Sequence, residues 1–545
     1  MRIKSKRIIS SIMCFALSFS MISLVQTNAV AVDAADDSKD MQIGLNVFAN
    51  DILKGNQSYD SVTSNGKLVD YTVCHFDPAS KTVNQAINDV KTVSEKFKES
   101  DTDFIANFEF QNFNQTATGP DGYSWVDNSN GCHRLSLSPD YLKALANCQN
   151  CKGVMIDEFE HAIINKNASI QLDSKLKYIL PVFPLAKTKD AYTQGEYLGN
   201  QLNSYVSDIK SCGIKSVYGE HVFPVLYHKF ADNGITPNFK SQKESHTTIQ
   251  YAIAAGAALE YGMPLSTCID NWFFNKNPGH SAEEMYQNFV FAYYSGINEA
   301  YTESVSVMTD DSDGKIINDY GKKFMQFCEE YKDKTRSYDI SDYRPEIGII
   351  RYDDTYYGQW LPVVFQGILF GNNKIKPDYR SKEYIKVLNI LTNGESARGG
   401  LSWNMFKLAS LKKHRSFTTF NSTAVFDHQV KKETLDSLKL CFLCGVYISD
   451  ETIKDVRDCV QNNGMTVVTT KRFLPKELAG KVKGSFCEIN DGKGKWVVVN
   501  SFDNIFLKSY LKPYLGKKNE IRLTFKDEEV VMQISKDGNS FTIKK

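Results

Sequence analysis

The sequence has 545 residues, with 64 basic and 64 acidic side chains, and therefore no formal net charge at pH 7. This balance argues against a protein that binds nucleic acid or another polyanion through bulk charge. A chain of this length exceeds a single hydrophobic core and is expected to form two or three domains.

The first 31 residues have the pattern of a secretory signal peptide of the bacterial type. Basic residues up to Arg7 precede the apolar run from Ile8 to Val25, and Ala29-Val30-Ala31 provides a cleavage site. No later segment has the roughly 18 uninterrupted apolar residues that a spanning helix needs. We therefore expect a secreted, extracellular protein with no membrane span in the mature chain.

Strand-like and helix-like patterns alternate from residue 41 to about residue 310. Thr82 and Ser281 are each followed by a helical pattern and are expected to cap its first turn. The predicted strands are 41–47, 70–76, 103–110, 153–156, 176–183, 214–218, 265–269 and 297–302. This size and rhythm predict an α/β fold with a (β/α)8 TIM barrel over residues 40–340.

The pattern changes after Arg344. Strand, helix and strand patterns predict a small parallel α/β domain at residues 345–478, with a linker near 337–344 ahead of Pro345. Residues 480–545, among them 495–499, alternate in the manner of strands and predict a C-terminal antiparallel β domain.

The stretch that begins at Gly153 carries the clearest functional pattern. Val154, Met155 and Ile156 form a continuous apolar run, typical of a strand covered on both faces, and Asp157 and Glu158 follow directly. An acidic first turn of a helix is the alternative interpretation. TIM barrels keep their chemistry where the strands end. The carboxylates expected on this rim are Glu109, Asp157, Glu158, Glu220, Asp270 and Glu303.

Carboxylates on one rim are the groups that glycoside hydrolysis needs, since it uses one acid and one nucleophile or base. The sequence therefore predicts a secreted glycosidase with a poly- or oligosaccharide substrate. Aromatic rings, including Tyr218, Phe273 and Tyr301, could stack on sugars, with ordinary core packing of each ring as the alternative. Amides and imidazoles could bind hydroxyl groups. The expected substrate-binding residues are His75, Asn107, Glu109, Trp125, Asp157, His161, Glu220, Asn271 and Trp272.

Two other classes of function remain open. A metal enzyme could use the same acids, but no His-x-His or His-Glu-x-x-His pattern is present, and the two Cys-x-x-Cys pairs lie nearly 300 residues apart. We therefore expect no metal and no cofactor. A carbohydrate-binding surface protein on a degenerate barrel is the second alternative, because a fold does not fix a function.

The order of barrel, α/β domain and β domain resembles that of the family 42 β-galactosidases. This resemblance implies a homo-oligomer formed through the small α/β domain and a retaining mechanism, with Asn-Glu after the fourth strand and Glu after the seventh. Asp157-Glu158 and Asp270 stand at those places, so the chain departs from the family pattern at the nucleophile.

The barrel is also similar to glycoside hydrolase family 98, whose members invert. That likeness implies Glu158 as the general acid, and Asp270 with Glu303 as the base. Because Asp270 is one methylene shorter than Glu, we predict room for a water molecule and therefore inversion, with the retaining mechanism as the alternative.

Overall fold

The structure is a computed structural model of the whole chain. It describes residues 39–78, 81–109, 125–127, 133–135, 137–164, 183, 185–273, 276–356, 369–396 and 414–544; the side chains of 125–127, 133–135, 161, 162 and 164 are not described. Within these ranges, no helix is both long enough and apolar enough to span a membrane.

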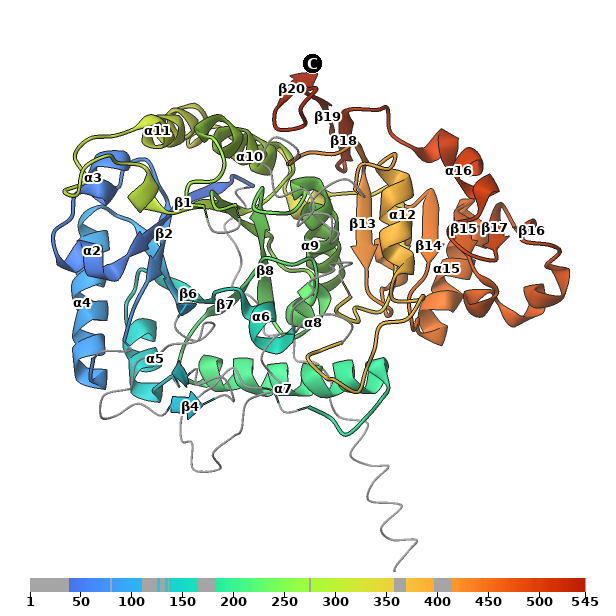
Figure 1. Cartoon of the computed structure of the whole chain (residues 1–545), viewed down its shortest axis with the longest axis horizontal. Helices are drawn as coiled ribbons and strands as arrows, with labels where there is room; N and C mark the ends of the chain where they lie inside the picture. The colour runs from blue at the N-terminus through green and yellow to red at the C-terminus, as the bar shows by residue number, and fades with distance from the viewer. Residues whose placement is uncertain are drawn as a thin grey trace, which may run out of the picture. The chain divides into compact units, whose positions relative to one another are not determined.

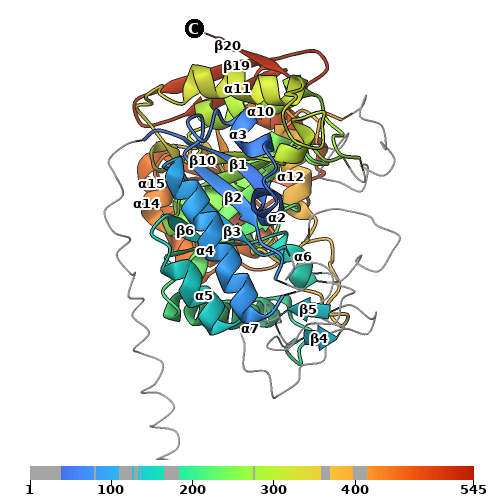
Figure 2. The ribbon, with the colours of Figure 1, turned by 90° about the vertical axis from the view of Figure 1, so that its left-hand side faces the viewer.

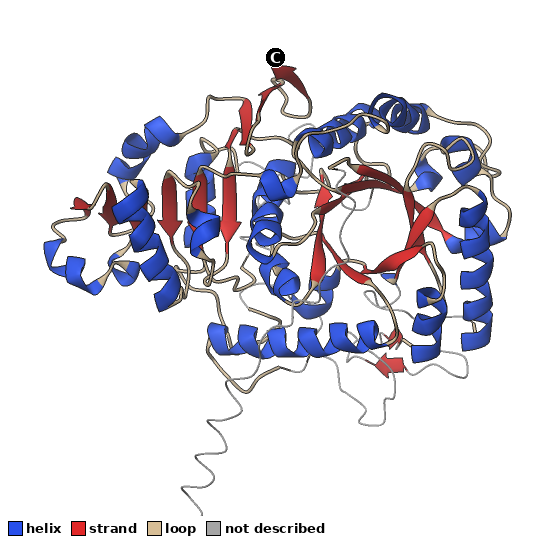
Figure 3. Ribbon diagram, turned by 180° about the vertical axis from the view of Figure 1, so that it is seen from behind, coloured by secondary structure: helices blue, strands red, loops and turns tan. Residues whose placement is uncertain are grey.

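Eight parallel strands close into a barrel in the order β1-β10-β9-β8-β7-β6-β3-β2. Figure 3 shows them as a ring with helices outside. The strands are β1 (Gln42–Phe48), β2 (Tyr71–His75), β3 (Asp103–Asn107), β6 (Cys151–Ile156), β7 (Ser216–His221), β8 (Ile235–Ser241), β9 (Ser266–Asp270) and β10 (Glu299–Glu303). The predicted TIM barrel is therefore confirmed.

One of the eight strands of the ring differs from the prediction. Residues 176–182 lie outside the described part of the chain, Phe183 is not in a strand, and the closed ring takes β8 instead. The sequence of β8, ITPNFKS, lacks an apolar pattern because Pro237, Asn238 and Lys240 interrupt it, yet every residue of the strand is buried. The other predicted strands overlap β1, β2, β3, β6, β7, β9 and β10.

Helices surround the barrel, and Figure 2 shows α4 and α5 side by side along it. Thr82 and Ser281 cap α4 and α10 as predicted, and both form capping boxes, with Gln85 and Glu284. The helices are α2 (Ala49–Leu53), α3 (Ser58–Val62), α4 (Val83–Glu99), α5 (Pro139–Ala146), α6 (Phe159–Ile164), α7 (Ala191–Ser211), α8 (Tyr227–Asp232), α9 (Thr247–Tyr261), α10 (Ala282–Tyr294) and α11 (Asp319–Tyr331); β4 (Trp125–Asp127) and β5 (His133–Leu135) form a hairpin.

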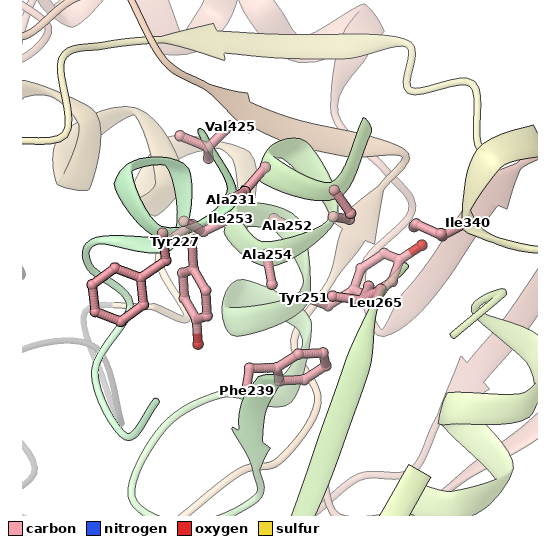
Figure 4. Close-up of a cluster of buried hydrophobic side chains, with 14 of the residues drawn as sticks. Tyr227, Ala231, Phe239, Tyr251, Ala252, Ile253, Ala254, Leu265, Ile340 and Val425 are labelled. Carbon is pink, nitrogen blue, oxygen red and sulfur yellow. The ribbon is translucent and has the colours of Figure 1, made fainter. Parts of the chain in front are cut away.

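Helix α9 joins the barrel to the rest of the chain. It packs against β8 on one side and against β13 (Thr423–Phe426) on the other (Figure 1), and its residues from Thr247 to Ala258 are buried. Figure 4 shows its alanines and Tyr251 among Phe239, Leu265 and Val425. Because small residues line α9, the two sheets can approach it closely.

The C-terminal region contains two sheets. A six-stranded sheet has the order β13-β11-β14-β15-β17-β16, with only β16 antiparallel, and a four-stranded sheet has the order β12-β18-β19-β20. The strands are β11 (Ile347–Ile350), β12 (Phe420–Asn421), β14 (Leu440–Leu443), β15 (Thr466–Thr469), β16 (Phe486–Asp491), β17 (Gly494–Val499), β18 (Glu520–Thr524), β19 (Glu529–Ile534) and β20 (Phe541–Lys544). The helices are α12 (Glu383–Leu391), α14 (Lys432–Leu435), α15 (Asp450–Asn463) and α16 (Ile505–Leu511).

One C-terminal strand lies in a different sheet from the one we predicted. Residues 495–499 belong to β17, which pairs in parallel with β15 in the six-stranded sheet. Trp496, Val497, Val498 and Val499 are all buried, as expected of an inner strand covered on both faces. The six-stranded sheet therefore includes strands beyond residue 478, and only the strands from β18 onward form antiparallel pairs in the four-stranded sheet.

Candidate active site

Four carboxylates, three of them buried, lie at the ends of four strands of the barrel on the same rim. Glu158 follows β6, Glu220 lies near the end of β7, and Asp270 and Glu303 are the last residues of β9 and β10. Glu158, Glu220 and Asp270 are each less than one tenth exposed, and the Glu303 side chain is 19% exposed. Such a set of acids needs compensating charge, since burying an unpaired carboxylate is strongly unfavourable.

The compensating charge comes from Lys240 on β8. Its side chain is 2% exposed, and its ammonium group is within ion-pair distance of all four acids. The distances from Nζ are 3.3 Å to Glu158 Oε1, 3.4 Å to Glu220 Oε2, 3.2 Å to Asp270 Oδ2 and 3.2 Å to Glu303 Oε2. Lys240 is therefore the centre of the site, on the strand that the sequence pattern does not predict.

A second ammonium group lies nearer the solvent. Lys243 follows β8, and its Nζ is 2.9 Å from Asp270 Oδ2 and 3.4 Å from Glu158 Oε1. His280 Nε2 donates to the Lys243 carbonyl oxygen at 2.9 Å, so the loop after β9 holds the loop after β8. Glu158 and Asp270 thus share both lysines.

The acids of this cluster differ in their protonation. Burial alone would raise the pKa of Asp270, but Lys243 and Lys240 hold it below its ordinary value, so Asp270 is a carboxylate at neutral pH. Burial raises the pKa of Glu303 to about 7 in spite of Lys240. Burial, together with the charge of Asp157, raises the pKa of Glu220 well above its ordinary value. One ionised and one protonatable carboxyl group beside each other is an arrangement that acid–base catalysis uses.

Lys240 acts as a charge and not as a nucleophile. Burial would lower its pKa, but Glu220, Glu303, Asp270 and Glu158 together raise it well above the ordinary value. The group is therefore an ammonium at neutral pH and has no lone pair with which to attack a carbonyl carbon. This arrangement disfavours a Schiff-base mechanism.

Glu158 has a backbone conformation that few residues with side chains adopt. Its φ of 43° lies in the left-handed region, which is strained for a residue other than glycine, asparagine or aspartate. Such strain is concentrated at functional sites, where the surrounding structure enforces it. The sharp turn after β6 thus places Glu158 beside the lysines.

For Tyr218 and Tyr301, the structure shows core packing and not sugar stacking. Tyr218 and Tyr301 lie inside the barrel with Tyr71, Met155 and Cys268, and both are less than one tenth exposed. The Tyr301 hydroxyl donates to Glu220 Oε1. These rings therefore form the floor beneath the carboxylates and cannot contact a substrate from solution.

His75, Glu109 and Asn107 occupy the neighbouring part of the rim. His75 Nδ1 is 3.0 Å from Glu109 Oε2, and the Glu109 side chain is 45% exposed. Burial lowers the pKa of His75, but the hydrogen bond and charge of Glu109 outweigh it and raise the pKa overall. Asn107 is buried, and its Oδ1 has no hydrogen-bond partner among the described residues. Asp157 is also buried, beside Glu158.

The structure corrects the prediction for Asn271. Its side chain is fully buried, accepts from Gln242 Nε2 at 3.0 Å and donates to Thr302 Oγ1 and the Glu303 carbonyl oxygen, both at 3.1 Å. Asn271 therefore fixes the ends of β9 and β10 instead of binding sugar.

Trp272 next to it is partly exposed and remains a candidate sugar contact. Phe273 is buried against His280 and His414. The side chains of Trp125 and His161 lie outside the described residues.

Within the described residues, one group of side chains has metal-ligand spacing. Ligand atoms of Glu220, Cys268 and Glu303 lie within 4.8 Å of one another. Lys240 already contacts both carboxylates, so an ammonium group occupies the position of the positive charge. Cys268 is buried in the barrel interior, and its pKa is raised well above the ordinary value, chiefly by burial. The cluster thus fits a lysine better than a metal ion.

No protein-family model and no curated protein matches this sequence. Solved structures match along most of the chain. A β-galactosidase from the Antarctic haloarchaeon Halorubrum lacusprofundi is 9% identical with a TM-score of 0.56, covering 90% of this chain and 93% of that chain. Gan42B, a GH42 β-galactosidase, is 10% identical with a TM-score of 0.55, covering 91% of this chain and 93% of that chain. The β-galactosidase from Rahnella sp. R3 is 10% identical with a TM-score of 0.52, again covering 91% of this chain and 93% of that chain. At such identity, the likeness shows the fold.

Proposed function

We propose that the protein is a glycoside hydrolase whose catalytic pair is Glu158 and Asp270. The observation that carries this proposal is that the two acids, from the fourth and seventh barrel strands, both contact Lys240 and Lys243 at the rim. The fold that the chain shares with β-galactosidases supports it. Glu158 would protonate the glycosidic oxygen as the bond to the anomeric carbon breaks.

The two lysines would keep Asp270 ionised and orient it. An ionised carboxylate is the form that stabilises, or attacks, the positive anomeric carbon of the transition state. Glu303, with a pKa of about 7, would remain largely protonated below neutral pH and would then add no second negative charge beside Asp270. Above that pH, its ionisation would change the field at the anomeric carbon.

The contact distances favour retention over the inversion that we predicted from the sequence. Glu158 Oε1 and Asp270 Oδ2 are 3.4 Å and 2.9 Å from the same Lys243 nitrogen. The distance between these two oxygens cannot exceed the sum of their distances from the Lys243 nitrogen. That limit is below the roughly 6.5–9.5 Å at which inverting enzymes separate their carboxyl groups, whereas retaining enzymes use about 5–5.5 Å.

A retaining reaction assigns each group a role in two steps. Asp270 would attack the anomeric carbon while Glu158 gives its proton to the leaving oxygen. Glu158, now a carboxylate, would then take a proton from water, and that water would attack the anomeric carbon and release Asp270. Inversion, as in the family 98 resemblance, would instead use Asp270 and Glu303 to activate water.

Activity is tested by incubating the purified protein with a panel of oligosaccharides and detecting new reducing ends. We expect hydrolysis by the wild type and a loss of at least about 100-fold in the Glu158→Gln variant on substrates with poor leaving groups. Glu99→Gln, on the exposed end of α4, is the matched control and should be fully active. Wild-type activity in Glu158→Gln would remove Glu158 from the mechanism.

Stereochemistry is tested by following the anomeric proton by NMR during the first minutes of hydrolysis. Retention predicts that the first product keeps the configuration of the substrate and that a fluorosugar forms a covalent adduct with Asp270. A first product of opposite configuration would restore the inverting assignment.

A non-catalytic carbohydrate-binding protein is the second candidate. The observation in its favour is that the ammonium groups of Lys240 and Lys243 lie between the acids, where a substrate must approach them. This candidate predicts that the wild type binds oligosaccharides in calorimetry but forms no new reducing ends. Turnover that depends on Glu158 would exclude it.

Two further expectations accompany the proposal. Residues 1–31 would direct export of the chain and be removed, which N-terminal sequencing of the secreted protein can test. The α/β region would mediate a homo-oligomer, as the family 42 resemblance implies, and light scattering of the purified protein measures the mass directly.

A further inference from the structure

A cavity of about 450 Å³ lies in the α/β region, apart from the barrel rim. Thr470, Lys471 and Arg472, which follow β15, form one side of it, and Asn500 and Ser501, which follow β17, form another. In open α/β sheets, ligands bind at the carboxyl ends of the parallel strands. The size is also within the range of small-molecule sites.

Positive charge predominates in the lining of this cavity. Lys386, Lys471 and Arg472 contribute three cations, and Glu383 is the one acid among the described lining residues. Glu383 Oε2 already accepts from the Gly445 backbone N–H at 3.0 Å and from Arg472 Nη2 at 2.9 Å. Lys386 pairs with Asp503. Lys471 is exposed and forms no ion pair with any described residue.

The guanidinium group of Arg472 is held in place by one of its nitrogens. Nη2 donates to Glu383 and to the Gly445 carbonyl oxygen, while Nε and Nη1 donate to no side chain or carbonyl oxygen of the described residues. A guanidinium with a fixed orientation is suited to binding a carboxylate through two parallel hydrogen bonds.

The beginning of α12 strengthens the preference for an anion. Glu383 and Lys386 in its first turn line the cavity, and the N-cap residue Lys382 makes no side-chain hydrogen bond to the helix. The first N–H groups of a helix lack partners within the helix and carry partial positive charge. The Glu383 N–H already donates to the Arg380 carbonyl oxygen at 3.0 Å, so the α12 terminus contributes partial positive charge to this side of the cavity.

An exposed ring stands at the edge of the cavity. Tyr379, in the turn before α12, lines the cavity and is 68% exposed, although it is a large aromatic side chain. Such a ring has a flat apolar face and a polar hydroxyl group. It is therefore suited to contact with a sugar ring.

We propose that this cavity is an ancillary binding site for an acidic sugar, whose carboxylate contacts Lys471 and Arg472 and whose ring contacts Tyr379. The negative charge of the ligand is inferred from the positive lining and the α12 terminus, and this step does not depend on the catalytic activity. That the ligand is a sugar rests on the proposed function. The site binds a charged glycan away from the barrel rim.

The test is calorimetric titration of the whole protein with galacturonate, with galactose and with sulfate at low ionic strength. We expect galacturonate to bind about tenfold more tightly than galactose, because only the acid pairs with the two cations. Lys471→Ala and Arg472→Lys should each weaken galacturonate binding about fivefold or more, since the second variant keeps the charge but loses the fork. Lys476→Ala, an exposed lysine outside the cavity, is the control and should bind like the wild type.

Three outcomes would overturn the assignment. The first is equal binding of galactose and galacturonate, and the second is unchanged galacturonate binding in Lys471→Ala and Arg472→Lys. The third is sulfate that displaces galacturonate at equal concentration, which would indicate an anion site without sugar preference. Hydrolysis of neutral glycosides should be unchanged in these variants, so a failure of the proposed enzyme activity would be seen separately from a failure of this site.

Discussion

The ammonium group of Lys240 lies among carboxylates from four different strands of the barrel. A charge in this position is favourable only because its partners are close, since removing any ion from water costs several kcal/mol. The same lysine contributes to the low pKa of Asp270 and partly offsets the effect of burial on Glu303. One side chain thus influences the charges of the whole rim.

Replacing Lys240 by methionine should destabilise the protein by about 3–5 kcal/mol, because the buried acids would lose their shared partner. Urea unfolding measures this change. Lys229→Met is the control: Lys229 is also buried, but it pairs with Glu196, whose side chain is 43% exposed. Water can hydrate Glu196 after the substitution, so the loss should be clearly smaller. Equal losses would show that Lys240, with four acids around it, is no more important to stability than Lys229 with its exposed partner.

The buried side chain of Glu160 is expected to make the stability of the protein depend on pH. Glu160 is fully buried and accepts from the backbone N–H groups of Val222 and Phe223 at 2.7 and 2.9 Å. Burial raises its pKa from 4.5 to about 8, although these hydrogen bonds oppose the shift. In this range the folded state binds a proton that the unfolded state has lost, so the contribution of Glu160 falls as pH rises from about 4.5 to about 8.

We therefore expect the Glu160→Gln variant to lose less stability than the wild type between pH 6 and pH 9. Glutamine keeps an acceptor for the two N–H groups but does not ionise. Melting temperatures across this pH range provide the measurement, and Glu99→Gln is the control for removal of a surface charge. Parallel curves for the wild type and Glu160→Gln would contradict the prediction.

At the scale of elements, the loops after β8 and β9 depend on a segment from the C-terminal region. The Thr247 N–H at the start of α9 donates to the Ser416 carbonyl oxygen at 2.7 Å, and His246 Nδ1 is 2.6 Å from the Arg415 carbonyl oxygen. Residues 415–417 are in turn bonded to residues 536–539, next to β20. The C-terminal sheet thus supports the loop that carries Lys243.

Helix α9 packs closely against the α/β region at Gly256. A Cβ atom on Gly256 would lie 1.8 Å from the Val425 carbonyl oxygen. Gly256→Ala should therefore destabilise the protein by about 1–3 kcal/mol or more, although alanine favours a helix. Gly199→Ala in α7 is the control, since its added Cβ would meet nothing closer than 3.8 Å. This variant should be about 0.5–1 kcal/mol more stable than the wild type.

Chemical unfolding of both variants, monitored by circular dichroism, gives the two changes in free energy. A Gly256→Ala variant as stable as the wild type would show that α9 and β13 are not packed as closely as the structure indicates.

At the scale of the whole molecule, the segment that we predicted as a linker is held against the barrel. Arg336 donates to the carbonyl oxygens of Tyr293 and Ile297 at 2.7 and 3.0 Å. Tyr338 donates to the Tyr294 carbonyl oxygen at 3.1 Å, and Tyr343 donates to the Thr423 carbonyl oxygen at 3.2 Å. The domain boundaries remain predictions, but this segment does not have the exposure of a flexible linker.

Limited proteolysis tests whether residues 336–343 are packed against the protein or form a flexible linker. The exposed fractions of Arg336, Tyr338, Ile340 and Tyr343 are all below one tenth, so trypsin and chymotrypsin should not make their first cuts between residues 336 and 343. Mass spectrometry of early fragments locates the cuts. The same bonds should be cut rapidly in the urea-unfolded chain, and early cleavage there in the native protein would instead indicate separable domains.

Repeated local patterns allowed the barrel to be predicted from the sequence. Apolar runs that end in polar residues marked β6 and β9, and capping residues marked α4 and α10, because these features depend on neighbours in the chain. For the same reason, Glu158, Asp270 and Glu303 could be assigned to one rim. Their order along the chain and the geometry of a closed parallel barrel are sufficient for that assignment.

Only the tertiary structure identified β8, Lys240 and the distances between the acids. The sequence of β8 is interrupted by Pro237 and polar residues, and a single lysine in such a segment is indistinguishable from one in a surface loop. Lys240 is stabilised by four carboxylates that lie between 20 and 82 residues away in sequence, so no local pattern could reveal it. The distance between Glu158 and Asp270 decides between inversion, which needs room for a water molecule, and retention by direct attack. This distance depends on how the closed barrel brings β6 and β9 together, because spacing along the chain does not determine distance in space.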